Sequence, residues 1–146
     1  MNIIVDSDAL LALINLNDSL HSEAKVLLNK LYAKKVQLLI LPTTLSEFSL
    51  IAVNRIGLPQ VKAVVAVWTE GGDHQIVEID KDLINFAVRL FQKQTSKEES
   101  LFDCFVMAAA SKYKYEAIFS FDKGYKKTKN NNLNLKLAAD LFLKAD

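Results

Sequence analysis

Residues 1–10 read MNIIVDSDAL, an apolar run that leads directly into two carboxylates. The β-branched segment at 2–5 predicts a short strand, and a continuous apolar run of this kind is typical of a strand buried on both faces. A second run of the same type, VQLLILP, occupies residues 36–42 and ends in proline. Strands buried on both faces occur in parallel sheets that lie between helices, so these two runs favour an α/β fold.

Segments with helical spacing alternate with strand-like segments along the rest of the chain. Apolar residues recur at the i, i+3, i+4, i+7 spacing of an amphipathic helix from Ala24 to Leu31 and again from Leu83 to Phe91. Helices are also predicted at 44–56, 60–69 and 101–113, and further strands at 75–79, 116–121 and, with a weaker pattern, 133–138. Such alternation implies crossover connections and therefore a mainly parallel central sheet flanked by helices.

Length and composition predict one soluble domain over residues 1–146. The chain has 51% apolar residues and a formal net charge of +1, and no Pro/Gly/Ser-rich stretch or long charge block divides it. The apolar run LLALINL is too short to span a bilayer and the N-terminus does not look like a signal peptide, so we expect a cytoplasmic protein. The single cysteine, Cys104, cannot form an internal disulfide and is expected to be a small buried side chain.

Carboxylates follow the predicted strands at the edge of the sheet where functional groups collect in parallel α/β folds. Asp6 and Asp8 follow the first strand, and Asp122 follows the strand-like segment AIFSF. Glu47 lies one turn into the helix after the second strand, and Asp103 opens the helix that leads into AIFSF. Four separate segments are therefore expected to bring acids to one edge of the sheet.

The same acids also have a purely local explanation. TLSE and SLFD both match the capping-box pattern, in which Glu47 and Asp103 would accept from the amides of Thr44 and Ser100. Asp8 is likewise placed to cap the first helix. Taken one at a time, each acid fits a cap or a solvated turn.

The helical faces of Glu47 and Asp103 argue for a second role. Both acids lie in line with apolar residues of their own helices, which are Leu50 and Ile51 in one case and Met107 and Ala110 in the other. A carboxylate that points inward without a partner is unfavourable, and several together repel each other. No lysine or arginine lies close to either acid in sequence, so a bound cation is the simplest neutralising group.

An all-oxygen ligand set favours a hard cation, Mg²⁺ or Mn²⁺, with retained water. Zinc is disfavoured because the two histidines, His21 and His74, lie far apart and outside the acidic positions, and one cysteine cannot supply a thiolate site. Both histidines are predicted to be surface residues.

Four segments, IIVDSDALLAL, TTLSEF, SLFDCFVMAAA and FSFDKGY, resemble in this order the PIN-domain ribonucleases, and among them the VapC-like toxins. In this resemblance Ser7 matches a small hydroxyl after the first acid, Ser120 begins the last motif, and Tyr125 takes an aromatic position. The acids of the family correspond to Asp6, Glu47, Asp103 and Asp122. Asp8 departs from the pattern, because small polar residues are common there, and it is either an additional ligand or only the helix cap.

The resemblance implies a PIN-like three-layer sandwich and a metal-dependent endoribonuclease, the toxin of a toxin-antitoxin pair. One or two Mg²⁺ or Mn²⁺ ions would lower the pKa of water and neutralise charge on the phosphodiester. Asp6, Asp103 and Asp122 would be ligands, directly or through water, and Glu47 either a ligand or a base that orients water. The resemblance also implies an RNA substrate, a cognate antitoxin and a homodimer.

A basic segment from Lys112 to Lys129 suggests nucleic-acid binding. Between 112 and 129 six lysines stand against two acids, a local balance of +4, and three tyrosines are interleaved with them. Lys123, Lys126 and Lys127 flank Asp122 and are best placed to contact a phosphate backbone, and Tyr125 to stack on an unpaired base. A solvated lysine face with buried aromatic rings is the alternative explanation.

Two other function classes fit part of the pattern. Asp6-Ser7-Asp8 matches the Asp-x-Asp opening of haloacid-dehalogenase-type phosphatases, in which the first Asp is the nucleophile and the second a general acid. Leu10, and the absence of a further acid after Asp122, argue against that class. A receiver-like interaction domain that binds Mg²⁺ without hydrolysis would leave the placement of Glu47 and Asp103 unexplained.

Overall fold

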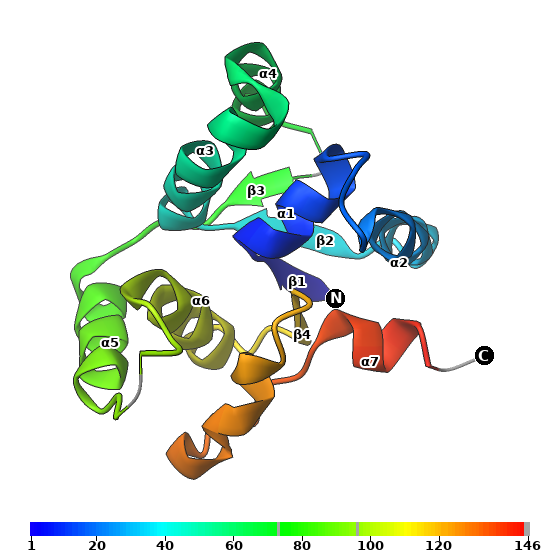
Figure 1. Ribbon diagram of the computed structural model, residues 1–146. Helices are drawn as coiled ribbons and strands as arrows, with labels where there is room; N and C mark the ends of the chain where they lie inside the picture. Colours follow the sequence, from blue (N-terminus) through cyan, green and yellow to red (C-terminus); the bar gives the residue numbers. More distant parts are fainter. Residues whose placement is uncertain (73, 96, 145–146) are drawn as a thin grey trace.

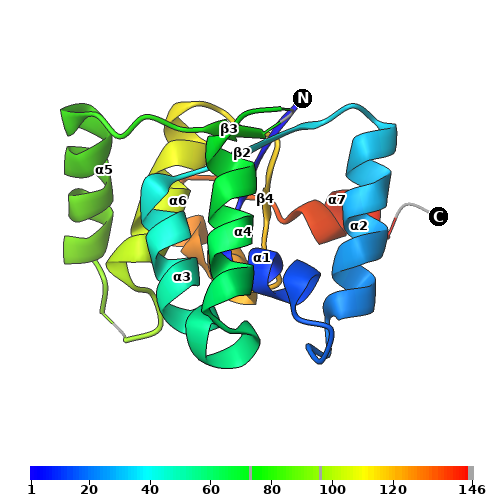
Figure 2. The ribbon, with the colours of Figure 1, turned by 90° about the horizontal axis from the view of Figure 1, so that it is seen from above.

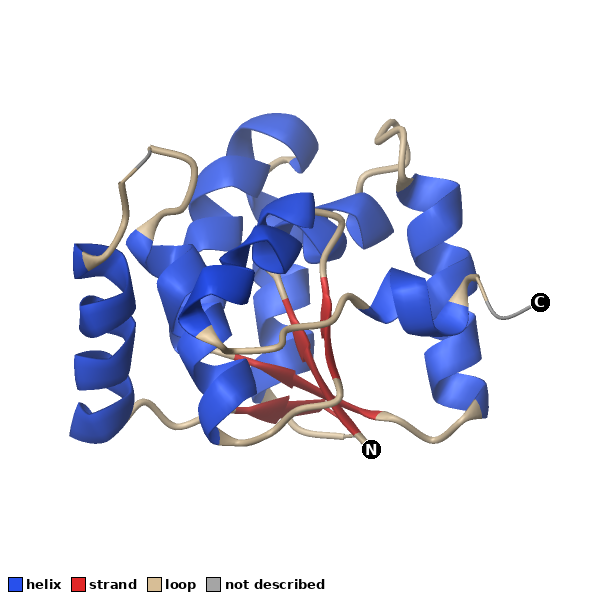
Figure 3. Cartoon of the chain, turned by 90° about the horizontal axis from the view of Figure 1, so that it is seen from below, coloured by secondary structure: helices blue, strands red, loops and turns tan. Residues whose placement is uncertain are grey.

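The computed structural model describes residues 1–72, 74–95 and 97–144, without the side chains of 128–131. Within this part of the chain, a four-stranded sheet has the order β3-β2-β1-β4, and all its strand pairs are parallel. The strands are β1 (Asn2–Val5), β2 (Gln37–Ile40), β3 (His74–Ile76) and β4 (Ala117–Phe119). They are short and enclosed by helices (Figure 3). The predicted α/β class with a parallel sheet is confirmed.

Helices cover both faces of the sheet. They are α1 (Ser7–Ile14), α2 (His21–Ala33), α3 (Pro42–Ile56), α4 (Leu58–Thr69), α5 (Lys81–Gln92), α6 (Leu101–Lys112) and α7 (Ala138–Phe142), with a 3₁₀ segment η1 (Lys123–Asn131). The pair α5 and α6 lies at one end of the molecule, and α2 and α7 lie together at the other (Figures 1 and 2). None of the helices in the described residues combines the length and the apolar character needed to cross a bilayer.

The core lies on both sides of the sheet because neighbouring residues of each strand point to opposite faces. Ile3 and Val5 pack with apolar residues of α1, α2, α3, α4 and α7, whereas Ile4 packs with those of α5 and α6. All three side chains are at most 1% exposed. This two-sided burial explains why the strand sequences are continuously apolar, and it confirms the three-layer arrangement.

The central position of β1 determines where the first acid lies. Ile3 pairs with Leu38 of β2 and with Ala117 of β4, so β1 is hydrogen-bonded on both sides. The amide of Asp6 continues this pairing by donating to the carbonyl of Phe119 at 3.0 Å. Asp6 is thus fixed at the carboxyl edge of the sheet by the same hydrogen bonds that hold the strands together.

The predicted strand at 133–138 is wrong. The described residues form only a single bridge there, between Ile118 and Leu137, and α7 begins at the next residue. Asn132 and Asn134 have φ values of 56° and 49°, in the left-handed region that Asn tolerates better than most residues. Two such residues close together interrupt the extended conformation, so the apolar alternation of this segment does not lead to pairing.

Candidate active site

Asp6 has two functions at the junction between β1 and α1. It is the N-cap of α1, and its Oδ1 accepts the Ser7 amide at 2.8 Å. It is also only 4% exposed, so its carboxylate lies inside the protein. The prediction that Asp8 caps this helix is wrong, because α1 begins earlier than an Asp8 cap requires, with Asp8 already in its first turn.

Asp103 likewise combines a local and a tertiary contact. Ser100 and Asp103 form the predicted capping box of α6, with Asp103 Oδ2 accepting the Ser100 amide at 2.9 Å. The other oxygen, Oδ1, lies 3.3 Å from the hydroxyl of Tyr125, and that hydroxyl donates to Asp6 Oδ2 at 2.6 Å. Tyr125 therefore connects the carboxylates of β1 and α6, and both explanations of Asp103 hold at once.

Glu47 does not form the capping box predicted for TLSE. The helix α3 begins at Pro42 after the N-cap Leu41, with no side-chain cap, so Glu47 lies in the second turn. Instead, the Ser7 hydroxyl donates a hydrogen bond to Glu47 Oε1. This contact joins α1 to α3 and places Glu47 beside the end of β1.

Asp8 holds the loop after β4. Its carboxylate accepts the Ser120 hydroxyl at 2.9 Å, the Phe121 amide at 2.8 Å and the Ala9 amide at 2.7 Å. The Ser120 oxygen in turn accepts the Asp122 amide at 3.0 Å. Asp8 thus positions the exposed Asp122, and both of its oxygens are engaged by protein donors.

We call Asp6, Asp8, Glu47, Asp103 and Asp122 the acidic cluster. Burial is the main reason that the pKa of Asp6 is raised to about 7. The charges of Asp8 and Asp103 also raise this pKa, and the hydrogen bonds from Tyr125 and Ser7 lower it. Burial also raises the pKa values of Asp8 and Glu47, with Asp122 adding to the first effect and Asp103 to the second. These mutual effects show that the predicted residues meet.

No described lysine or arginine side chain neutralises the acidic cluster. Among the side chains that the structure describes, which exclude those of 128–131, none forms an ion pair with a member of the cluster. Among the described residues, no three acidic, histidine or cysteine side chains are grouped closely enough to hold a metal ion as they stand, and the Tyr125 hydroxyl lies between the carboxylates of Asp6 and Asp103. An all-oxygen set of this kind fits Mg²⁺, which is usually held by one or two carboxylates and retained water.

The other predicted ligand types lie elsewhere. Cys104 is fully buried, as expected, and burial raises its pKa to about 11. Both histidines are partly exposed and lie outside the acidic positions. His21 contacts the Ala12 carbonyl at 2.8 Å, and His74 packs against Trp68 with ring centroids 4.5 Å apart.

The predicted RNA-binding residues differ in their exposure. Tyr125 is 3% exposed, so the prediction that its ring stacks on a base is wrong, because the ring fills the core and the hydroxyl serves the carboxylates. Lys126 pairs with Asp140 at 2.7 Å, and Lys127 lies 3.9 Å from Glu98. Lys123 is exposed next to Asp122. The side chain of Lys129 lies outside the described residues.

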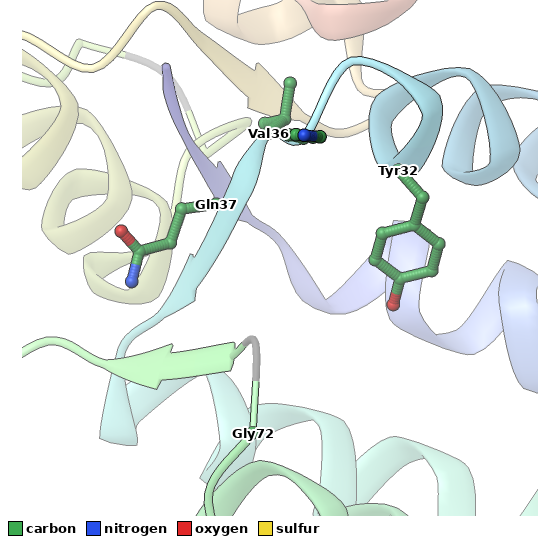
Figure 4. Close-up of a pocket in the computed structure, with 5 residues that line it drawn as sticks. Tyr32, Val36, Gln37 and Gly72 are labelled. Carbon is green, nitrogen blue, oxygen red and sulfur yellow. The ribbon is translucent and has the colours of Figure 1, made fainter.

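Two of the cavities among the described residues lie at different ends of the sheet. One of about 530 Å³ lies at the amino ends of the strands, far from the acids, and is lined by Tyr32, Lys35, Val36, Gln37 and Gly72 (Figure 4). The other adjoins Ser7 and Asp8 and includes Arg55, a residue that sequence reasoning missed. The available signal was helical spacing, because Glu47 and Arg55 are eight residues apart on α3.

Comparison with known proteins agrees with this geometry. The chain matches the family model described as PIN domain over residues 3–131, and it therefore belongs to the PIN domain family. No curated protein sequence gives a significant match. The resemblance inferred from the motifs is confirmed.

Two solved structures share the fold. VapC20 of Mycobacterium tuberculosis, described as a Sarcin-Ricin loop cleaving toxin, is 22% identical with a TM-score of 0.76, covering 86% of this chain and 94% of that chain. FitAcB from Neisseria gonorrhoeae is 14% identical with a TM-score of 0.59, covering 92% of this chain and 95% of that chain. At such identities the likeness shows the PIN-like fold, and it extends over most of each chain.

Proposed function

We propose that this chain is a metal-dependent endoribonuclease that hydrolyses RNA phosphodiester bonds as the toxin of a toxin-antitoxin pair. The observation that carries the proposal is the acidic cluster, in which carboxylates from four segments lie at one edge of the sheet and form no ion pair with a described lysine or arginine side chain. The PIN domain match, and a similar structure described as a Sarcin-Ricin loop cleaving toxin, support the reaction class.

Asp6 and Asp103 are the residues proposed to hold the ion directly, because their carboxylates face each other across the Tyr125 hydroxyl. Asp122 and Glu47 would contact it through water. A bound Mg²⁺ or Mn²⁺ would lower the pKa of water and neutralise charge on the phosphodiester. Ser7 orients the Glu47 carboxylate, which is placed to accept a proton from water, and Asp8 keeps Asp122 at the edge of the cluster.

We also propose three partners on the basis of the family resemblance, which are an antitoxin, a second copy of the chain and RNA. A cognate antitoxin would cover the acidic cluster, and the toxin would be a homodimer in the cytoplasm. Lys123 is the best placed of the predicted lysines to contact RNA, since Lys126 is paired with Asp140. The single domain over 1–146 stays a prediction.

Cleavage of a labelled, structured RNA pool by the purified protein, with Mg²⁺, Mn²⁺ or EDTA, tests the proposal. Asp103→Asn keeps an oxygen for the Ser100 amide, so α6 stays capped while the charge is lost. The matched control is Asp82→Asn, which changes an exposed acid in the first turn of α5. We expect metal-dependent cleavage by the wild type and the control, and a loss of at least about a hundredfold in Asp103→Asn.

Equal cleavage by all three proteins would refute the assignment of the site. Absence of cleavage in all three, together with hydrolysis of p-nitrophenyl phosphate, would favour the phosphatase class. That class requires Asp8 as a general acid, whereas both Asp8 oxygens are engaged by the Ser120 loop and the Ala9 amide. Mg²⁺ binding without hydrolysis of either substrate would favour the receiver-like class.

A further inference from the structure

A small cavity, here called the α3 pocket, lies directly beside the acidic cluster. Its volume is about 200 Å³, and it is lined by Ser7, Asp8, Leu11, Phe48, Ile51 and Arg55. Pockets that enclose whole small-molecule ligands have volumes of about 300–1,000 Å³. The α3 pocket is therefore better suited to one unit of a longer chain than to a free ligand.

The α3 pocket and the acidic cluster are continuous. Asp8 belongs to both, and Ser7 lines the pocket while donating to Glu47. Along α3, Glu47, Ile51 and Arg55 follow each other at i, i+4 and i+8 and so lie in one row. The helical rise places Arg55 about 12 Å along the axis from Glu47. A group that contacts Arg55 therefore lies next to the reacting position and not at it.

Arg55 supplies an available positive charge. Its side chain is exposed at the end of α3, and among the described residues it forms no ion pair, not even with Asp8 in the same pocket. A guanidinium has a planar fork of donors that matches two oxygens of a phosphate. The acidic cluster repels polyanions, so a cation beside it has a direct use in holding a phosphate chain.

The rest of the α3 pocket is apolar. Leu11 and Phe48 are 7% and 1% exposed, whereas Ile51 is 40% exposed and is the most accessible of the apolar residues that line it. Unpaired bases stack on aromatic side chains or arginine, and bases turned out of a helix are also held against apolar side chains, whereas phosphates contact arginine and lysine. The combination of one arginine and an apolar wall is thus appropriate to a nucleotide.

We infer that the α3 pocket is a nucleotide subsite, in which Arg55 binds a phosphate next to the cleaved bond and Ile51 contacts the attached base. This inference rests on the proposed ribonuclease function. It places cations on two sides of the acidic cluster, with Arg55 on the helix after β2 and Lys123 after β4, and β1 lies between these strands. RNA would cross the carboxyl edge of the sheet between them.

The test compares Arg55→Gln with Arg89→Gln, which removes the same charge from α5, where Arg89 lies over the Phe86 ring. Binding of the labelled RNA pool is measured by fluorescence anisotropy in Mg²⁺ at several salt concentrations, with Asp103→Asn in every protein to prevent cleavage. We expect Arg55→Gln to weaken RNA binding about tenfold. The slope of the logarithm of the binding constant against the logarithm of the salt concentration should become shallower by the amount that corresponds to about one phosphate contact. Arg55→Lys should restore part of the affinity, and Arg89→Gln should leave it within twofold.

A second pair of variants tests the apolar wall. Ile51→Trp fills the α3 pocket, and Leu50→Trp adds the same side chain at the neighbouring position, which is 70% exposed and does not line the pocket. In the active protein we expect Ile51→Trp to raise KM for the cleaved RNA about tenfold, and Leu50→Trp to leave KM unchanged.

Equal RNA affinity of Arg55→Gln and Arg89→Gln would overturn the inference whether or not the parent protein cleaves RNA. Poly-glutamate serves as a second probe in the same binding assay. If Arg55→Gln bound poly-glutamate more weakly than Arg89→Gln did, but bound RNA equally well, the inference would also be overturned, and the α3 pocket would be assigned to an acidic partner protein. By contrast, RNA binding that depends on Arg55 in a protein that never cleaves would support the subsite and refute the nuclease.

Discussion

Replacing Asp6 by asparagine should stabilise the metal-free protein while abolishing its activity. The folded protein raises the pKa of this carboxyl from 3.8 to about 7, mainly through burial and the charge of Asp8. The folded state therefore binds the proton more tightly than the unfolded chain, so the free energy of unfolding falls as the pH rises from about 4 to about 7. The pKa difference, at 1.36 kcal/mol per unit, corresponds to about 4 kcal/mol lost by pH 8.

The asparagine side chain introduced by Asp6→Asn has the same shape without the charge. Its oxygen still accepts the Ser7 amide, but the favourable ionic contact with the Tyr125 hydroxyl is lost, which offsets part of the gain from removing the buried charge. We therefore expect the free energy of unfolding to rise by about 2–4 kcal/mol at pH 8 and to change little at pH 4. Urea unfolding in EDTA at both pH values measures this. Mg²⁺ should then stabilise the wild type more than Asp6→Asn, because only the wild type presents the full set of carboxylates.

The control for this experiment is Asp82→Asn, an exposed position where we expect a change within about 0.5 kcal/mol at either pH. The reasoning is refuted if Asp6→Asn is less stable than the wild type at pH 8. It is equally refuted if both proteins lose the same free energy of unfolding between pH 4 and pH 8, since the buried charge of Asp6 would then contribute nothing.

Three further changes have definite expected results. Asp8→Ala should lower kcat for RNA cleavage about tenfold or more, because the loop that carries Asp122 loses its acceptor; a kcat within twofold of the wild type would contradict this. Tyr125→Phe removes the hydroxyl that lowers the pKa of Asp6, so a carbon-13 NMR titration of the metal-free protein should show that pKa raised relative to the wild type, and an unchanged value would count against the contact. Phe48→Ala opens a cavity in the core and should reduce the free energy of unfolding by about 3–5 kcal/mol in urea, whereas the exposed Leu50→Ala should change it by less than about 0.5 kcal/mol.

Much of the fold follows from local sequence patterns. The continuous apolar runs at 2–5 and 36–42 predicted strands buried on both faces, and the structure forms them as β1 and β2. The capping box at Ser100 and Asp103 was also readable, since it depends on residues three apart. Patterns of this kind succeed because the apolar composition that suits a doubly buried strand, and the residues of a helix cap, both lie in short stretches of sequence.

The composition of the candidate site was partly readable as well. Strand-end and helix-start positions identified the members of the acidic cluster, because parallel strands bring their carboxyl ends to one edge of the sheet. The sequence did not show whether each of these acids caps a helix or belongs to the site. Asp6 and Asp103 turn out to serve both purposes, whereas Glu47 serves only the tertiary contact with Ser7.

Tertiary structure alone decided the roles of Asp8, Tyr125 and Arg55. Asp8 bonds the loop more than a hundred residues away, and Tyr125 turns its hydroxyl to Asp6 and not to solvent. Arg55 reaches the edge of the cluster only because α1 packs against α3. The physical reason is that a carboxylate or hydroxyl bonds whichever donor or acceptor the packed core brings within about 3 Å, and that choice is made by the contacts between elements, whereas the elements themselves are specified by their own sequences.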